Sequence, residues 1–140
     1  MRLLVCTFTF AIVLAGPAAA ADLTVSPTAA GALEAHRGKP WYVPLNNCAG
    51  FHIFNGRRLK EAGDASGSAA ETAKAADFMT AAATRISQDQ GKTYDQAFAG
   101  NQRKVQNAVT ALEMAIAPPD PAAWTKVCGE IMAGYRKVVG

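Results

Sequence analysis

The sequence predicts an all-α protein: an antiparallel four-helix bundle stapled by one disulfide and preceded by an irregular N-terminal segment. Apolar residues recur about every 3.6 residues in four stretches after Asn46, and no useful strand-like alternation interrupts them. Two cysteines, Cys48 and Cys128, remain once the N-terminal leader is set aside. The connections between the helical stretches are short, which favours antiparallel neighbours.

Length and composition limit the classes of protein to consider. The 140 residues fit one domain, and a chain that is 50% hydrophobic is too apolar to be disordered. A formal net charge of +3 is too small for a dedicated nucleic-acid-binding protein. We therefore expect a globular domain with no nucleic-acid partner.

Residues 1–21 have the features of a secretory signal peptide. Arg2 supplies the positive charge, and residues 3–15 form an uncharged apolar run. This run is shorter than the roughly 20 residues that a membrane span needs. Small residues follow it, so cleavage is expected after Ala20 or Ala21. These features predict export to the periplasm or secretion, with no stable membrane insertion after cleavage.

The cysteine count predicts one disulfide. Cys6 lies within the signal peptide, so the mature chain keeps Cys48 and Cys128. An even count in an exported chain indicates that the two are paired, although two buried free thiols are the alternative. Closing a loop of this size stabilises a fold by roughly 4–5 kcal/mol in the chain-entropy model.

The segment 22–45 is predicted to be extended or irregular because three prolines interrupt it. A short helix is expected to open near Ser26 and run toward His36, with Gly38 as its stop. Residues 41–43 lie between two prolines, so we expect them to be extended and to place their aromatic side chains on the core.

The helical domain is predicted over residues 46–140. Its first helix is expected over 46–62, with Asn46 or Asn47 as the N-cap and Gly63 as the stop. Its predicted core face starts at Leu45 and comprises Leu45, Cys48, Phe51, His52, Asn55, Leu59 and Ala62.

The second helix is predicted to start at a capping box formed by Ser68 and Glu71, in which the glutamate reaches back to the cap. It is expected to run to about Gln88, and Gly91 ends the segment. Its predicted core face is Thr72, Ala75, Ala76, Met79, Ala82, Ala83 and Ile86.

The third and fourth helices have clear start signals. Thr93 and Gln96 form a second capping box, and the helix is expected to run to Ala117, where two prolines stop it. Asp120 followed by proline predicts the start of the fourth helix, which runs to about Val138. The predicted core faces are Tyr94, Ala97, Phe98, Asn101, Val105, Ala108, Val109, Leu112, Ala115 and Ile116 on the third helix, and Trp124, Val127, Cys128, Ile131, Tyr135 and Val138 on the fourth.

Motifs for metal binding or catalysis are missing from the sequence. The two histidines, His36 and His52, are far apart, and neither an HExxH, a CxxC nor a CxxCH motif occurs. No serine lies in a G-x-S-x-G motif, and the carboxylates lie mostly at helix caps and on polar faces. We therefore expect no metal, no cofactor and no catalytic residues.

His52 is the most unusual polar residue of the predicted core, with Asn55 one turn later. One hypothesis is a pH switch, in which a buried neutral imidazole must take up charge as the pH falls and so loosens the bundle. The alternative is a structural histidine bonded to a backbone carbonyl or to Tyr135. Asn101 is interpreted as a polar core residue that sets helix register.

Two further features suggest a partner surface. Ile53 and Phe54 lie off the main core stripe and would form an exposed apolar patch, unless the helix is buried on more than one side. Arg57 and Arg58, with Lys60, would face an acidic partner or anionic lipid, or simply lie on a solvated face.

The segment Cys48-Ala49-Gly50-Phe51-His52 opens the first predicted helix after a signal peptide. It resembles small exported proteins of Gram-negative bacteria that pair a Cys-x-Gly-aromatic helix start with a second cysteine near the C-terminus. The architecture is also similar to that of the periplasmic immunity proteins that neutralise type VI amidase effectors, although this chain has one expected disulfide and no proline-cysteine ending. The acid-stress periplasmic chaperones share its helical, one-disulfide character.

The sequence therefore predicts an exported, non-enzymatic protein that acts through an unidentified protein partner, as an interaction protein or an inhibitor of the immunity type. An acid-stress chaperone and a small ligand-binding protein are the alternatives. His52, Phe54, Arg57 and Arg58 are the candidate partner or pH-sensing surface, and Cys48 and Cys128 are the candidate disulfide.

Overall fold

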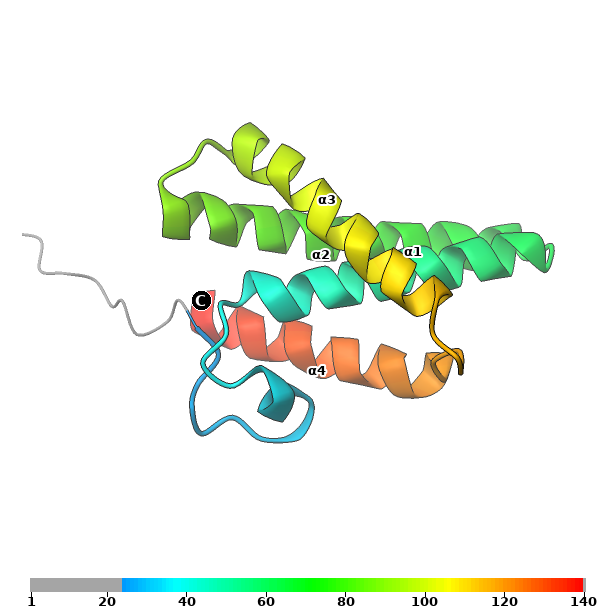
Figure 1. The fold of residues 1–140 in the computed structure, drawn as a ribbon, viewed down its shortest axis with the longest axis horizontal. Helices are drawn as coiled ribbons and strands as arrows, with labels where there is room; N and C mark the ends of the chain where they lie inside the picture. Colours follow the sequence, from blue (N-terminus) through cyan, green and yellow to red (C-terminus); the bar gives the residue numbers. More distant parts are fainter. Residues whose placement is uncertain (1–23, 140) are drawn as a thin grey trace, which may run out of the picture.

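The computed structural model describes residues 24–139, so the predicted signal peptide and Cys6 lie outside the described residues. Helices dominate this part of the chain, which confirms the all-α prediction (Figure 1). The elements are the 3₁₀ helix η2 (Gly31–His36) and the α-helices α1 (Tyr42–Glu61), α2 (Ala65–Gln90), α3 (Tyr94–Glu113) and α4 (Pro121–Val139).

Helix α1 is the centre of the fold. It packs against α2, α3 and α4, while α2 also packs against α3, and η2 packs against α4 and α1. Figure 1 shows α3 crossing α1 obliquely and α4 running along the other side of α1. The main buried cluster follows from this arrangement, because Leu45, Cys48 and Phe51 of α1 are all completely buried within it. The antiparallel bundle arrangement as such stays a prediction.

The N-terminal segment is irregular, as predicted, only as far as Trp41. Residues 42–45 belong to α1, so the expected extended conformation of residues 41–43 and the predicted caps at Asn46 and Asn47 are wrong. Pro44 is tolerated because it is the third residue of the helix, where a backbone N–H has no acceptor within the helix.

A tight loop closes the N-terminal segment onto the core. The backbone N–H of Val25 donates to the Lys39 carbonyl at 2.9 Å, and the N–H of Gly38 donates to the Val25 carbonyl at 2.9 Å. Gly38 takes a positive φ of 68°, which confirms it as the stop after the short helix at His36. These bonds hold Val25 completely buried in the core cluster, which also contains Trp41.

Helix α2 begins one turn earlier than predicted. Its cap is Asp64, whose carboxylate accepts a hydrogen bond from the Gly67 N–H at 2.8 Å. The predicted capping box at Ser68 is therefore wrong, and Glu71 is buried rather than reaching back to a cap. Gly91 ends α2 in the left-handed conformation, as expected.

Helix α3 starts as predicted and ends early. The Thr93 hydroxyl accepts from the Gln96 N–H at 3.3 Å, and the Gln96 side chain accepts from the Thr93 N–H at 3.2 Å, which confirms the capping box. The helix ends at Glu113 rather than Ala117, so residues 114–117 separate it from the two prolines that were expected to stop it. Ile116, predicted to lie on the core face, is fully exposed.

Helix α4 starts as predicted, since the carboxylate of Asp120 accepts from the Ala122 N–H at 3.0 Å. Its predicted core face is confirmed at Cys128, Ile131 and Tyr135, which are buried. The Sγ atoms of Cys48 and Cys128 lie 2.15 Å apart, so the two cysteines predicted to pair are at disulfide distance. The pair joins α4 to the N-terminal half of α1.

Gly50 marks the close approach of α1 to α3. A Cβ atom added at Gly50 would lie 2.6 Å from the Ala108 Cβ and 3.2 Å from the Val109 backbone nitrogen. Gly100, in α3, is the matched control, because an added Cβ there would meet nothing within 4 Å. Comparing alanine substitutions at the two glycines therefore distinguishes the effect of a steric clash from the effect of helix propensity.

We expect Gly50→Ala to lower the free energy of unfolding by about 1–3 kcal/mol, because the added methyl group forces the two helices apart. Gly100→Ala should raise it by about 0.5–1 kcal/mol through helix propensity alone. Urea unfolding followed by circular dichroism measures both. A Gly50→Ala variant at least as stable as the wild type would contradict the close packing of α1 on α3.

Candidate functional site

The candidate site residues predicted on α1 do not form one surface. His52 is buried, with 2% of its surface exposed, and Phe54 is buried at 9%. The proposed exposed patch at Phe54 is therefore wrong, because central α1 is covered on more than one side. Arg57 and Arg58 are exposed, as predicted, and the Arg58 guanidinium lies 5.8 Å from the centre of the Phe54 ring.

His52 pairs with a buried carboxylate that the sequence analysis assigned to a helix cap. Its Nδ1 lies 2.6 Å from Oε2 of Glu71, and the two side chains are 2% and 8% exposed. The other carboxylate oxygen, Oε1, accepts a hydrogen bond from Lys74 Nζ at 2.7 Å. The imidazole also stacks on Phe78, with 5.4 Å between ring centres, so hydrogen bonding and packing both hold the ring.

The pKa of Glu71 is held below its ordinary value of 4.5. Burial alone would raise this pKa, but hydrogen bonds from His52, Lys74 and Asn55 to the carboxylate outweigh that effect. An ionised carboxylate only accepts hydrogen bonds, so Nδ1 of His52 carries a proton. When the ring is neutral, its Nε2 then presents a lone pair.

The pH-switch hypothesis for His52 stays a prediction. Its structural alternative gains a partner that the sequence did not indicate, because Glu71 accepts a hydrogen bond from Nδ1. The expected partner Tyr135 is wrong, because its hydroxyl donates to the Ala81 carbonyl at 3.4 Å.

The burial of Glu71 was not predicted, because the predicted core face of α2 is turned by about one residue from the observed one. Thr72 and Ala76 are exposed, whereas Glu71, Ala75 and Phe78 are buried. A spacing of four and then three residues places these three on one face. Phe78, the only aromatic residue of α2, was the signal that would have set the face correctly.

A second buried polar pair joins α1 to α3. Nδ2 of Asn46 donates to Oδ1 of Asn101 at 2.7 Å, and both side chains are buried. Asn101 is therefore a polar core residue, as predicted. Because a buried amide without a partner is costly, the pair favours one alignment of α1 on α3.

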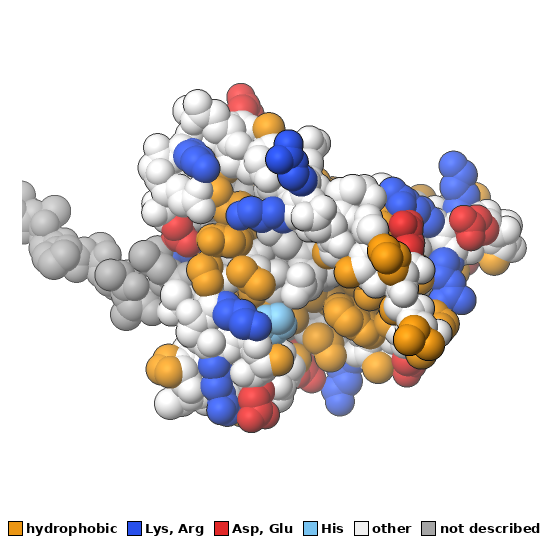
Figure 2. Space-filling view, in the orientation of Figure 1, with side chains coloured by type: hydrophobic (Ala, Val, Ile, Leu, Met, Phe, Trp, Pro, Cys, Tyr) orange, Lys and Arg blue, Asp and Glu red, His pale blue; other side chains and the backbone are white. Residues whose placement is uncertain are grey.

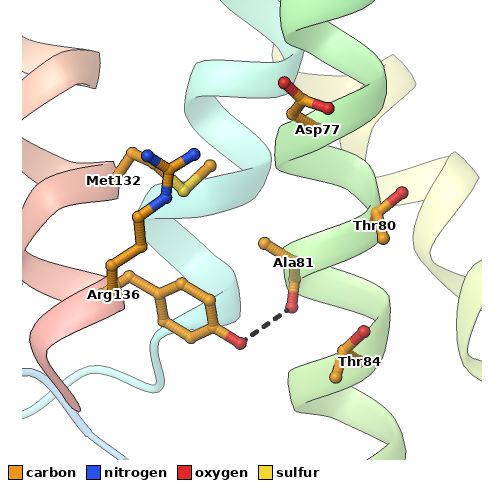
Figure 3. Close-up of a pocket in the computed structure, with 7 residues that line it drawn as sticks. Asp77, Thr80, Ala81, Thr84, Met132 and Arg136 are labelled. Carbon is orange, nitrogen blue, oxygen red and sulfur yellow. Dashed lines mark hydrogen bonds between the residues drawn. The ribbon is translucent and has the colours of Figure 1, made fainter. Parts of the chain in front are cut away.

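A groove runs between α2 and α4. One hollow of about 370 Å³ and one of about 210 Å³ share Asp77, Met132 and Arg136, and together we name them the α2–α4 groove. Figure 3 shows Asp77 on one wall and Arg136 on the other, on either side of this hollow. The remaining lining residues are Thr80, Ala81, Thr84 and Tyr135 in the larger hollow, and His52, Lys74, Phe78, Thr125 and Gly129 in the smaller.

An apolar surface lies at the α3–α4 connection. Met114 is 77% exposed and Ile116 is fully exposed, and we name these two residues the α3–α4 patch. Beside it, a hollow of about 200 Å³ is lined by Asn47, Ala108, Ala111, Leu112 and Trp124. Figure 2 shows hydrophobic side chains gathered over this end of the molecule, with Lys and Arg side chains nearby.

Neither a metal-binding cluster nor a membrane-spanning helix occurs among the described residues. Between residues 24 and 139, no group of three or more His, Cys, Asp or Glu side chains is placed to hold a metal ion. Over the same residues, every helix is too short or too polar to cross a membrane.

Comparison of the chain with protein-family models, with curated proteins and with solved structures found no match in any of the three. The resemblance carried by residues 48–52 therefore stays a prediction.

Proposed function

We propose that this is an exported, non-enzymatic protein that acts by binding another protein, as an interaction protein or an inhibitor of the immunity type. The exposed α3–α4 patch is the observation that carries the proposal. An antiparallel four-helix bundle fastened at Cys48 and Cys128 serves as its scaffold. A cysteine pair at disulfide distance suits an oxidising compartment, which is consistent with export.

The α3–α4 patch has the character of a binding surface. Met114 and Ile116 expose large apolar side chains to water. This exposure is unfavourable in free energy, and burial against a partner would remove the unfavourable contribution. The neighbouring hollow of about 200 Å³ has Leu112 and Trp124 in its lining, so it suits an apolar anchor side chain. The two prolines after Ala117 restrict the backbone of the connection, which lowers the entropy lost on binding.

Charge beside the patch indicates the chemistry of the partner. Glu113 adjoins Met114, and its Oε1 holds Arg57 Nη1 at 2.7 Å, so a basic side chain is fixed at the edge of the patch. Arg58 and Lys60 are exposed on the same final turns of α1. We expect a partner surface with an apolar anchor surrounded by acidic side chains.

The test compares capture from periplasmic extract by the wild type and by the double variant Met114→Asp/Ile116→Asp. The matched control is Val139→Asp, a residue 46% exposed at the opposite end of α4. We expect the wild type and the control to capture the same protein, and the double variant to capture at least about tenfold less of it.

Circular dichroism establishes that the variants are folded, and high salt should weaken capture because charge steers the contact. Capture of nothing above background by the wild type would overturn the proposal. Undiminished capture by the double variant would remove the α3–α4 patch as the binding surface.

A further inference from the structure

We propose that the α2–α4 groove binds a free α-amino acid with an apolar side chain. The carboxylate of the ligand would meet Arg136, its ammonium group would meet Asp77 and Nε2 of His52, and its side chain would lie against Phe78 and Met132. This site involves residues other than those of the α3–α4 patch, so it stands independently of the proposed protein contact.

His52 places a buried polar side chain in the wall of the groove. The ring lines the smaller hollow, yet only 2% of the residue is exposed. Its Nδ1 is held by Glu71 at 2.6 Å, whereas within residues 24–139 Nε2 has no hydrogen-bond partner. With Nδ1 protonated, Nε2 of the neutral ring accepts a hydrogen bond, and an ammonium group is a fitting donor.

Two opposite charges line the same groove. Asp77 on α2 and Arg136 on α4 line both hollows, and neither forms an ion pair within the described residues. Lys74, the other charged lining residue, is already bound to Glu71 at 2.7 Å. An unpaired guanidinium across from an unpaired carboxylate matches a zwitterion better than a simple anion or cation.

The rest of the lining accounts for the size and the apolar character of the ligand. Phe78 is buried and Met132 half-buried, and both line the smaller hollow beside His52. The residues proposed to contact the charged groups, His52, Asp77 and Arg136, also line this smaller hollow, so the site lies within it. Its volume of about 210 Å³ is below the roughly 300–1,000 Å³ typical of sites for drug-sized molecules and cofactors. A single amino acid is therefore a better fit than a nucleotide or a large cofactor.

The experiment titrates the full mature protein with L-phenylalanine and with L-leucine near neutral pH, by calorimetry and by amide NMR. Two analogues test the contribution of each charged group of the amino acid. The first, 3-phenylpropionate, lacks the ammonium group, and the second, phenethylamine, lacks the carboxylate. We expect saturable binding of at least one amino acid, with shifted resonances on α2 and α4, and binding of both analogues weaker by at least about tenfold.

Variants of exposed groove residues complete the test without threatening the fold. Arg136→Gln and Asp77→Asn should each weaken binding by at least about tenfold, whereas Lys137→Gln, one residue along and outside the groove, should leave it unchanged. The double variant Met114→Asp/Ile116→Asp should also bind normally, which separates this site from the patch.

Three results would overturn the proposal. The first is the lack of saturable binding of either amino acid up to about 10 mM. The second is an analogue that binds as well as the amino acid. The third is an equal loss of affinity in Lys137→Gln and Arg136→Gln, which would indicate general charge attraction rather than a site.

Discussion

Cys128→Ser is expected to lower the free energy of unfolding by about 4 kcal/mol, the largest effect of any single change. Cys48 and Cys128 are 80 residues apart in the sequence, and a cross-link over that distance removes much of the entropy of the unfolded chain. Both sulfur atoms are buried where α4 meets α1, so the serine hydroxyl would also be left in an apolar core.

Thermal unfolding of the oxidised wild type and the variant measures this effect, with a fall in Tm on the order of 15 °C for a chain of this size. Cys6→Ser is the control and should leave the Tm unchanged, because Cys6 lies in the predicted signal peptide and not in the predicted mature protein. Reduction of the wild type should reproduce the Tm of Cys128→Ser. Equal melting of the oxidised wild type and Cys128→Ser would refute a structural disulfide.

Glu71→Ala is expected to have the second largest effect, a loss of about 2–3 kcal/mol, because it leaves the buried Nδ1–H of His52 without an acceptor. Glu113→Ala is a matched control. The Glu113–Arg57 contact is 2.7 Å, close to the 2.6 Å of Glu71–His52, but its side chains are 42% and 49% exposed. Its loss should cost no more than about 1 kcal/mol.

Urea unfolding at neutral pH compares the two variants with the wild type. Each variant removes one carboxylate from a contact of similar length. A difference between them in the free energy of unfolding therefore measures the contribution of burial. If the two variants lost the same stability, Glu71 would not be the structural partner of His52.

The Glu71 contact also predicts a pH dependence. The pKa of Glu71 is lower in the folded state than its ordinary 4.5, so ionised Glu71 stabilises the fold above about pH 4.5. That stabilisation is lost as the pH falls below 4.5, through the folded-state pKa. The difference in unfolding free energy between the wild type and Glu71→Ala should therefore be constant from neutral pH to about pH 5 and shrink below it.

Near-UV circular dichroism and unfolding curves over this range test the dependence. The result bears on the acid-stress chaperone, because such a protein would lose its tertiary structure as the pH falls. Loss of the tertiary signal well above about pH 5 would contradict the role given to Glu71.

Local signals predicted the helix termini where one side chain caps one backbone group. The capping box at Thr93 and Gln96, the cap at Asp120 and the stop at Gly91 are all confirmed, because each involves residues within four positions of one another. The start of α2 was wrong because Asp64 and Ser68 are both suitable caps.

Apolar periodicity alone was insufficient to predict which face of α2 is buried. Alanines occupy adjacent positions at 75–76 and 82–83, so a shift of the face by one residue changes the apolar pattern very little. The large side chain of Phe78 sets the face in the structure, and that rotation brings Glu71 inward to His52.

The sequence by itself determined the helical class, most helix ends and the cysteine pair, because these depend on neighbouring residues or on a simple count. Only the tertiary structure decided the partner of His52, the exposure of Ile116 and the opposed charges of Asp77 and Arg136. The physical reason is that burial and pairing depend on which helix faces meet. That is set by close approaches such as Gly50 on Ala108, between residues far apart in the chain.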